Sequence, residues 1–292
     1  MKLEWKISPR DVEKVRAIVE RQASSPLVQY RLSVNLAKKK SLVSRDSFWR
    51  ALVGALLTSQ QRSGPESSVS RFINTRPHPI GYAACRRQPK LSPFLQTTLA
   101  DFGGIRFSTK LASVLSSNYS HLENGAWQEV LSRLNALTTP AAQEAEREVA
   151  EYLDDEFKGL GPKQSRNLLQ GLGLTRYEIP VDSRITKWLN KFGFPFHLTA
   201  AALVDRHYYG LVSDGIQHLC QAAGVMPCVF DAAVPNAKGT LPGTAGCDLV
   251  HRLSPAVCGL TSGGVPRPEG LPKAPCTAPA PSPRPSGGIQ SP

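Results

Sequence analysis

The sequence is short of acidic residues and of long apolar runs, and each shortage narrows the class of protein. Against 35 lysine and arginine residues stand only 23 aspartate and glutamate residues, which leaves a net charge of +12. A surplus of this size favours a polyanionic partner, with nucleic acid first and an anionic membrane surface second. The longest charge-free apolar run, about residues 51–57, is far shorter than the roughly 20 residues that span a bilayer. We therefore do not expect this chain to be an integral membrane protein.

Cysteine is also scarce, with six residues in a chain of 292. So few cysteines in a chain of this length do not make a disulfide scaffold, which favours a reducing compartment. The first residues, MKLEWK, lack the apolar core of a signal peptide. We expect an intracellular protein, in the cytoplasm or nucleoid of a prokaryote or in the nucleus of a eukaryote.

Aromatic residues are missing altogether from the last part of the chain, residues 236–292. Proline and glycine together supply 20 of these 57 residues. Such a segment cannot bury enough apolar surface to offset the entropy of ordering it, so we predict a disordered, low-complexity tail. A natural tail and a frame-shifted end both remain open. Most of the basic surplus, +9, lies in residues 1–235.

Residues 1–235 have helical periodicity nearly throughout. A helix start is predicted at Ser8-Pro9-Arg10-Asp11, and a core helix from about Ser44 to Ser59. Further apolar residues at helical spacing indicate helices near 91–102, 108–118, 126–136 and 140–155. No window alternates as a strand would, and no internal repeat is present. The sequence therefore predicts an all-α fold of roughly ten short helices.

The most informative stretch is FKGLGPKQSRNLL, residues 157–169. A helix ends near Asp155, a Gly159-Leu160-Gly161 hairpin follows, and Pro162 opens the next helix. Glycines permit a positive φ and a close approach of the backbone to a ligand. The free N–H groups at the start of the second helix favour a phosphate oxygen, which is a sequence-independent way to hold DNA.

A second segment, EIPVDSRI, places Asp182 19 residues after Lys163 at the start of another helix. Together the two segments resemble the helix-hairpin-helix motif and the following aspartate loop of the endonuclease III-like (HhH-GPD) superfamily of DNA glycosylases. The pattern there is Leu-Pro-Gly-Val-Gly-x-Lys-x-Ala, followed by Val-Asp; Phe157, Lys158 and Ser165 depart from it conservatively. The stretch LLTSQQ, residues 56–61, resembles the Leu-Leu-Ser-x-Gln end of an early family helix. The likeness spans roughly residues 40–230 and is sharp in these three places.

The resemblance implies a two-lobed, all-α helix-hairpin-helix DNA glycosylase fold with a DNA cleft between the lobes. One lobe would be 38–176, ending in the hairpin, and the other would combine 1–37 with 182–235. The implied partner is double-stranded DNA containing a damaged base, bound by a monomer in base-excision repair. Lys163 would form a Schiff base and cleave the strand as an AP lyase, and Asp182 would be the catalytic carboxylate. Gly159, Leu160 and Gly161 would bind DNA, and Gln60 or Gln61 would fill the gap left by the flipped base.

The resemblance also bears on substrate and cofactor. A hairpin lysine without a cluster motif favours the lyase-competent 8-oxoguanine type, while oxidised pyrimidines and alkylated purines remain open. Downstream cysteines are separated by 8, 19, 11 and 18 residues, at Cys220, Cys228, Cys247, Cys258 and Cys276. No compact quartet exists, so we expect no iron–sulfur cluster, and the six histidines have no metal-ligand spacing. We expect no cofactor.

Simpler interpretations stand beside these. Asp182 alone would be a helix N-cap, Lys163 a solvated or phosphate-binding lysine, and Gln60 an exposed helix end. Arg184 is expected on a solvated face, with a phosphate contact as the alternative. At the level of the whole protein the alternatives are a non-catalytic helix-hairpin-helix DNA-binding protein, a monofunctional glycosylase for alkylated bases, and an RNA-binding helical protein.

Overall fold

Helices are the only regular secondary structure in the residues that this computed structural model describes, which are 5–64 and 66–235. Thirteen of them are α-helices: α1 (Pro9–Arg21), α2 (Pro26–Tyr30), α3 (Arg45–Leu57), α4 (Ser68–Asn74), α5 (Tyr82–Arg86), α6 (Leu91–Phe102), α7 (Ser108–His121), α8 (Trp127–Ala136), α9 (Gln143–Glu156), α10 (Pro162–Gly171), α11 (Ser183–Phe192), α12 (Arg206–Ala223) and α13 (Pro227–Ala233). Short π-helical turns at Arg31–Asn35 and Leu122–Ala126 and a 3₁₀ turn at Ala202–Val204 join them. The all-α prediction is confirmed, and the predicted tail 236–292 lies outside the described residues.

Helix starts follow the signals in the sequence. Ser8 caps α1 in a capping box with Asp11, and Pro9 occupies the first helical position. Ser44 caps α3 in the same way. The helix before the hairpin ends at Glu156 and the next one starts at Pro162, as predicted. No helix in the described ranges combines the length and the apolarity that crossing a membrane requires.

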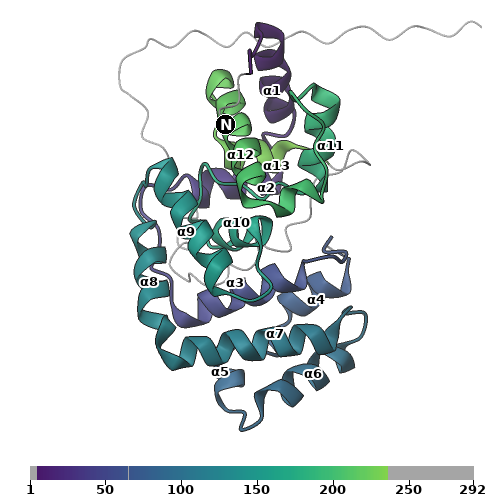
Figure 1. The fold of residues 1–292 in the computed structure, drawn as a ribbon, viewed down its shortest axis with the longest axis vertical. Helices are drawn as coiled ribbons and strands as arrows, with labels where there is room; N and C mark the ends of the chain where they lie inside the picture. The colour runs from purple at the N-terminus through teal and green to yellow at the C-terminus, as the bar shows by residue number, and fades with distance from the viewer. Residues whose placement is uncertain (1–4, 65, 236–292) are drawn as a thin grey trace, which may run out of the picture. The chain divides into compact units, whose positions relative to one another are not determined.

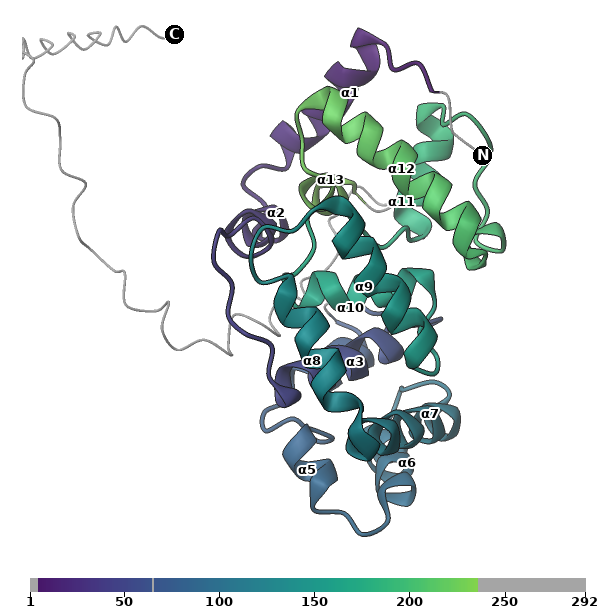
Figure 2. The ribbon, with the colours of Figure 1, turned by 60° about the vertical axis from the view of Figure 1, so that its left-hand side comes forward.

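Buried apolar residues form two clusters. The larger cluster runs from Val43 to Leu174 and includes α3 to α10. The smaller combines residues from Val15 to Tyr30 with residues from Ile179 to Val234. In Figures 1 and 2, α1, α11, α12 and α13 accordingly gather together, away from α5, α6 and α7. Contacts group all the described residues into one compact unit, so the division into separate lobes at 38–176 stays a prediction.

The hairpin depends on α3, which is buried along almost its whole length. Helix α10 packs against both α3 and α9, and Figure 2 shows it between them. Ser165, on α10, is completely buried; this small side chain lets the helices approach closely. Because α9 and α10 are both fixed to this core, the Gly159-Leu160-Gly161 turn between them is presented on a rigid support.

Candidate active site

The hairpin between α9 and α10 is fixed in place by its neighbours. Gly159 has φ +80°, and a Cβ there would lie 3.0 Å from both Leu56 Cδ2 and Val114 Cγ1. The backbone of Lys158 is held at both ends by Asn118, whose Oδ1 accepts from the Lys158 N–H at 2.9 Å and whose Nδ2 donates to its carbonyl at 3.0 Å. Only glycine fits at position 159, because the chain combines a left-handed conformation with close packing there.

The first turn of α10 offers donors without acceptors. Gly161 caps the helix with an extended backbone, φ −144°. Within the described chain, no acceptor binds the amides of Lys163 and Gln164, which is the arrangement that favours an anion at a helix N-terminus. The partly buried Lys163 side chain makes no hydrogen bond or ion pair with any described residue. Its amine is therefore available to a ligand.

Asp182 caps α11. Its Oδ1 accepts hydrogen bonds from the N–H groups of Arg184 at 2.8 Å and Ile185 at 3.0 Å, and its Oδ2 accepts one from Arg184 Nε at 3.2 Å. The N-cap interpretation is confirmed. The side chain is still 29% exposed, so the same carboxylate is held rigidly and can be reached from outside.

Arg184 does not lie on a solvated face, so that prediction is wrong. Its side chain is only 10% exposed and forms an ion pair with Asp231 at 2.7 Å. The same guanidinium donates to the carbonyls of Asp231 and Val234, both at 2.6 Å. Burial works to lower the pKa of Arg184, but the carboxylates of Asp231 and Asp182 outweigh it and raise the pKa. The sequence could not show this, because Asp231 lies 47 residues further along the chain.

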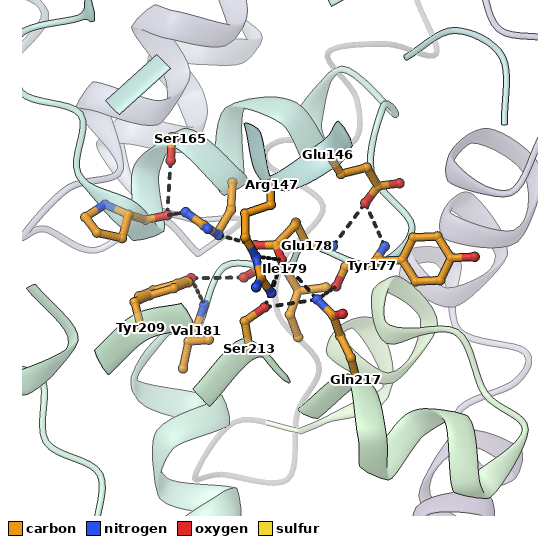
Figure 3. A network of polar contacts seen from close by, with 12 residues as sticks. Glu146, Arg147, Ser165, Tyr177, Glu178, Ile179, Val181, Tyr209, Ser213 and Gln217 are labelled. Carbon is orange, nitrogen blue, oxygen red and sulfur yellow. Dashed lines mark hydrogen bonds and ion pairs between the residues drawn. The ribbon is translucent and has the colours of Figure 1, made fainter. Parts of the chain in front are cut away.

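A buried polar network joins α9, α10 and α12 to the segment that leads to Asp182 (Figure 3). At its centre is the fully buried Glu178, which pairs with Arg166 at 2.5 Å and with Arg147 at 2.9 Å. Ser213 and Gln217 donate to the same carboxylate, at 3.1 and 3.0 Å. Burial would raise the pKa of Glu178, but the two guanidinium groups hold it below its usual range.

The preceding residues of this segment are held by a second carboxylate. Glu146, on α9, accepts hydrogen bonds from the backbone N–H groups of Arg176, Tyr177 and Glu178 at 2.8 to 3.0 Å. Burial raises the pKa of Glu146 despite these donors. The segment between α10 and α11 is therefore anchored along its length, which limits how far Asp182 can move relative to Lys163.

The structure separates Gln60 from Gln61. The Gln61 amide is hydrogen-bonded at both its nitrogen and its oxygen, with Nε2 donating to the Leu57 carbonyl at 2.6 Å and Oε1 accepting from the Arg106 N–H at 2.9 Å. Gln60 is exposed and has φ +56°, an unusual conformation for a residue other than glycine. Of the two candidates, Gln60 has the side chain that is available to contact a ligand. The Gln61 side chain instead stabilises the loop through its hydrogen bonds.

The Gln60 loop lies beside the start of α10. Two side chains of α10 reach it: Gln164 Nε2 donates to Ser59 Oγ at 3.3 Å, and Asn167 Nδ2 donates to Thr58 Oγ1 at 3.2 Å. Gln164 directly follows Lys163. The structure thus brings the early Thr-Ser-Gln-Gln segment and the hairpin helix together, over 100 residues apart in sequence.

Phe107 is a further residue near these loops that sequence patterns did not predict. This aromatic residue is 48% exposed, has φ +60°, and carries the Arg106 guanidinium 4.9 Å from its ring centroid. Phe107 and Gln60 are the two residues other than glycine with positive φ in the described ranges, and the Gln61–Arg106 hydrogen bond ties their loops together. A basic Ile-Arg-Phe segment after Gly103-Gly104 was the available signal.

The described ranges hold no cluster of side chains that could bind a metal ion. No three or more histidine, cysteine or acidic side chains there come together as ligands. Cys85, Cys220 and Cys228 are free and buried, and burial raises the pKa of Cys228 to about 12. Cys247, Cys258 and Cys276 lie outside the described residues, so the expectation of no cofactor stays a prediction.

Three solved structures that this chain resembles are of 8-oxoguanine DNA glycosylases. The 8-oxoguanine DNA glycosylase of Methanocaldococcus jannaschii matches 79% of this chain and 95% of its own, with a TM-score of 0.58 and 16% identity. That of Thermotoga maritima matches 76% and 93%, with a TM-score of 0.53 and 16% identity. A complex of the M. jannaschii glycosylase/lyase with a 15mer DNA containing 8-oxoguanine matches 77% and 93%, with a TM-score of 0.50 and 13% identity.

Sequence comparisons give no further match. No protein-family model and no curated protein matches this chain. The structural likenesses show that it has the helical fold of these glycosylases, and at this identity they show the fold alone.

Proposed function

We propose that this protein is a base-excision repair glycosylase that removes a damaged base from duplex DNA and cleaves the strand as an AP lyase. The observation that carries the proposal is the position of Lys163 and Asp182 at the starts of two successive helices. Each occupies the N-terminal end of a helix, the two helices are joined by a segment anchored through Glu146 and Glu178, and the fold is that of known glycosylases.

Lys163 is the proposed nucleophile. Its neutral amine attacks C1′ of the flipped nucleotide, the glycosidic bond breaks, and the base leaves with the bonding electrons and takes up a proton. The amine attached to C1′ then loses a proton and its lone pair opens the sugar ring; the C1′–O4′ bond breaks and O4′ takes up a proton. The iminium group that results acidifies the C2′–H bond. Loss of that proton expels the 3′-phosphate by β-elimination, which cleaves the strand. The absence of any partner for Lys163 in the described chain supports this role.

Asp182 is the proposed electrostatic stabiliser. Breaking the glycosidic bond gives the sugar oxocarbenium character, and a fixed carboxylate beside it lowers the energy of that state. The hydrogen bonds from the α11 backbone and from Arg184 keep the carboxylate in one orientation. Little reorganisation is then needed when positive charge develops on the sugar.

The loops around these residues supply the DNA contacts. The hairpin and the free amides of α10 would bind a phosphate on the damaged strand. Taking the base out of the stack costs a few kcal/mol. We expect Gln60 and Phe107 to offset part of this cost, by filling the space that the base leaves or by separating the neighbouring bases. Exposed Arg62, Arg106 and Lys110 add cationic side chains near the same two loops.

The proposed substrate is an oxidised purine of the 8-oxoguanine class, acted on by a monomer. Support comes from the hairpin lysine together with the three similar solved structures, which are of 8-oxoguanine glycosylases. The test is a panel of duplexes carrying 8-oxoguanine, an oxidised pyrimidine, an alkylated purine or no lesion. We expect excision and strand cleavage with 8-oxoguanine. Excision without strand cleavage would indicate a monofunctional glycosylase, and binding with neither excision nor cleavage would indicate a non-catalytic DNA-binding protein.

A further inference from the structure

Two buried side chains hold the residues that directly precede Lys163 and Asp182. The carbonyl of Pro162, one residue before Lys163, accepts a hydrogen bond from Arg166 Nη1 at 3.0 Å. The N–H of Val181, one residue before Asp182, donates to the hydroxyl of Tyr209 at 2.7 Å. That hydroxyl donates in turn to the carbonyl of Ile179 at 2.9 Å, and Figure 3 shows Tyr209 bridging the two backbone groups.

Arg166 and Tyr209 also contact each other. The guanidinium carbon lies 4.6 Å from the centroid of the Tyr209 ring. Both side chains are inaccessible to solvent, with Arg166 1% and Tyr209 0% exposed. A cation over an aromatic ring is attracted most strongly when both are desolvated. A continuous path of contacts therefore runs from Pro162 through Arg166 and Tyr209 to Val181.

The charge of Arg166 is balanced inside the protein. Its Nε lies 2.5 Å from Glu178 Oε2, and Glu178 belongs to the same segment as Val181. A buried ion pair of this kind adds little stability compared with apolar side chains of similar volume, because both charges lose their hydration. What it does supply is geometry, since a guanidinium fork and a phenol hydroxyl fix the direction of the groups that they bind.

We propose that Arg166 and Tyr209 are positioning residues that set the separation and orientation of the Lys163 amine and the Asp182 carboxylate. The inference rests on the proposed function of that pair. Neither residue touches DNA, since both are buried. Misplacement of a reacting group by about 1 Å can lower the rate about 100-fold. Loss of the Arg166 or Tyr209 contacts should therefore slow the chemical step while DNA binding is unaffected.

Tyr209→Phe is the sharpest test, because it keeps the ring under Arg166 and removes only the hydroxyl that holds Ile179 and Val181. The matched control is Tyr208→Phe on the same helix, whose hydroxyl donates at 3.4 Å to the His197 carbonyl away from this path. Single-turnover excision, DNA affinity and melting temperature are measured for wild type and both variants on an 8-oxoguanine duplex and on an abasic duplex.

We expect Tyr209→Phe to lower the single-turnover excision rate by about 10- to 100-fold, with DNA affinity within about threefold of wild type and Tyr208→Phe unchanged. In an Asp182→Asn background the Tyr209→Phe substitution should have little further effect, because the two changes act through one group. This lack of additivity is a readout that a purely structural role would not produce.

Two results would overturn the inference, and they differ. Wild-type excision rates in a folded Tyr209→Phe protein, or full additivity with Asp182→Asn, would remove the positioning role and leave the glycosylase proposal standing. A wild-type protein that neither excises any lesion nor cleaves abasic DNA would remove the proposed function itself, and the inference with it.

Discussion

Arg184 binds the carboxylates of both Asp182 and Asp231, with Nε 3.2 Å from Asp182 Oδ2 and Nη2 2.7 Å from Asp231 Oδ1. The candidate catalytic carboxylate is thus tied to α13, the last described helix, as well as to its own helix. Because Arg184 is nearly buried, this arrangement orients Asp182 more strongly than a solvent-exposed ion pair would.

Asp182→Asn should separate capping from catalysis. Asparagine caps helices about as well as aspartate, so the melting temperature should change little. The charge proposed to stabilise the oxocarbenium-like sugar is lost, so excision should fall by about 100-fold or more, the scale of one lost electrostatic stabiliser. Single-turnover kinetics and thermal unfolding measure the two effects. A large loss of stability with normal turnover would make Asp182 a structural cap only.

The two hairpin glycines should respond differently to alanine. Gly159→Ala places a Cβ 3.0 Å from Leu56 and Val114 in a backbone with φ +80°, so we expect a loss of at least about 1–2 kcal/mol in unfolding free energy. Gly161→Ala is the matched control, since its backbone is extended and the nearest atom would be 3.8 Å away. It should keep the fold and, by holding a phosphate off the backbone, weaken DNA binding. Equal stability of the two variants in urea denaturation would contradict the packing argument.

The two neighbouring glutamines provide a second matched pair. Gln60→Gly relieves a positive φ and should raise stability by up to about 1 kcal/mol, while lowering excision by about tenfold because the gap in the duplex is left unfilled. Gln61→Ala removes the hydrogen bonds to Leu57 and Arg106 and should lower stability by about 1 kcal/mol. Chemical denaturation and single-turnover excision of both variants distinguish the roles. A Gln61→Ala protein that is stable but inactive would show that Gln61, and not Gln60, fills the gap in the duplex.

Lys40 should make stability depend on alkaline pH. Burial, followed by the nearby charge of Arg176, lowers its pKa from 10.5 to about 8, and the amine finds no hydrogen-bond partner in the described chain. The unfolded chain keeps the proton up to about pH 10.5 and the folded chain only to about pH 8, so this group makes stability rise with pH across that window. Lys40→Met should therefore be more stable than wild type at pH 7, with the difference shrinking by pH 10.

Exposed Lys39 is the control for this effect. Lys39→Met should show no such pH-dependent gain in urea denaturation. A gain for Lys40→Met that is the same at pH 7 and at pH 10 would show that packing, rather than the buried charge, accounts for it.

Local signals in the sequence predict much of the fold. They do not predict polar contacts between residues that are far apart in the chain. The cap at Ser8, the start of α3 after Ser44 and the hairpin boundaries follow from residues within one helical turn of each other. The burial of Arg184 depends on Asp231, 47 residues away. Nor could spacing distinguish Gln60 from Gln61, since the difference lies in a backbone torsion and in a hydrogen bond to Arg106.

The buried network around Glu178 could not be predicted either, because its members are far apart in the sequence. Taken singly, Arg147, Arg166 and Glu178 look like surface charges on helices and loops, because such residues are almost never buried unless paired. Their partners come from α9, α10 and α12, and only the folded chain brings these together.

Borohydride trapping tests the central claim most directly. Borohydride reduces an imine between a lysine and C1′ to a stable covalent bond, so wild-type protein mixed with an 8-oxoguanine or abasic duplex should form a protein–DNA adduct that survives denaturing gels. Lys163→Ala should form none while still binding the duplex, because the proposed phosphate contact is made mainly by the hairpin backbone. Undiminished trapping by folded Lys163→Ala would contradict the account.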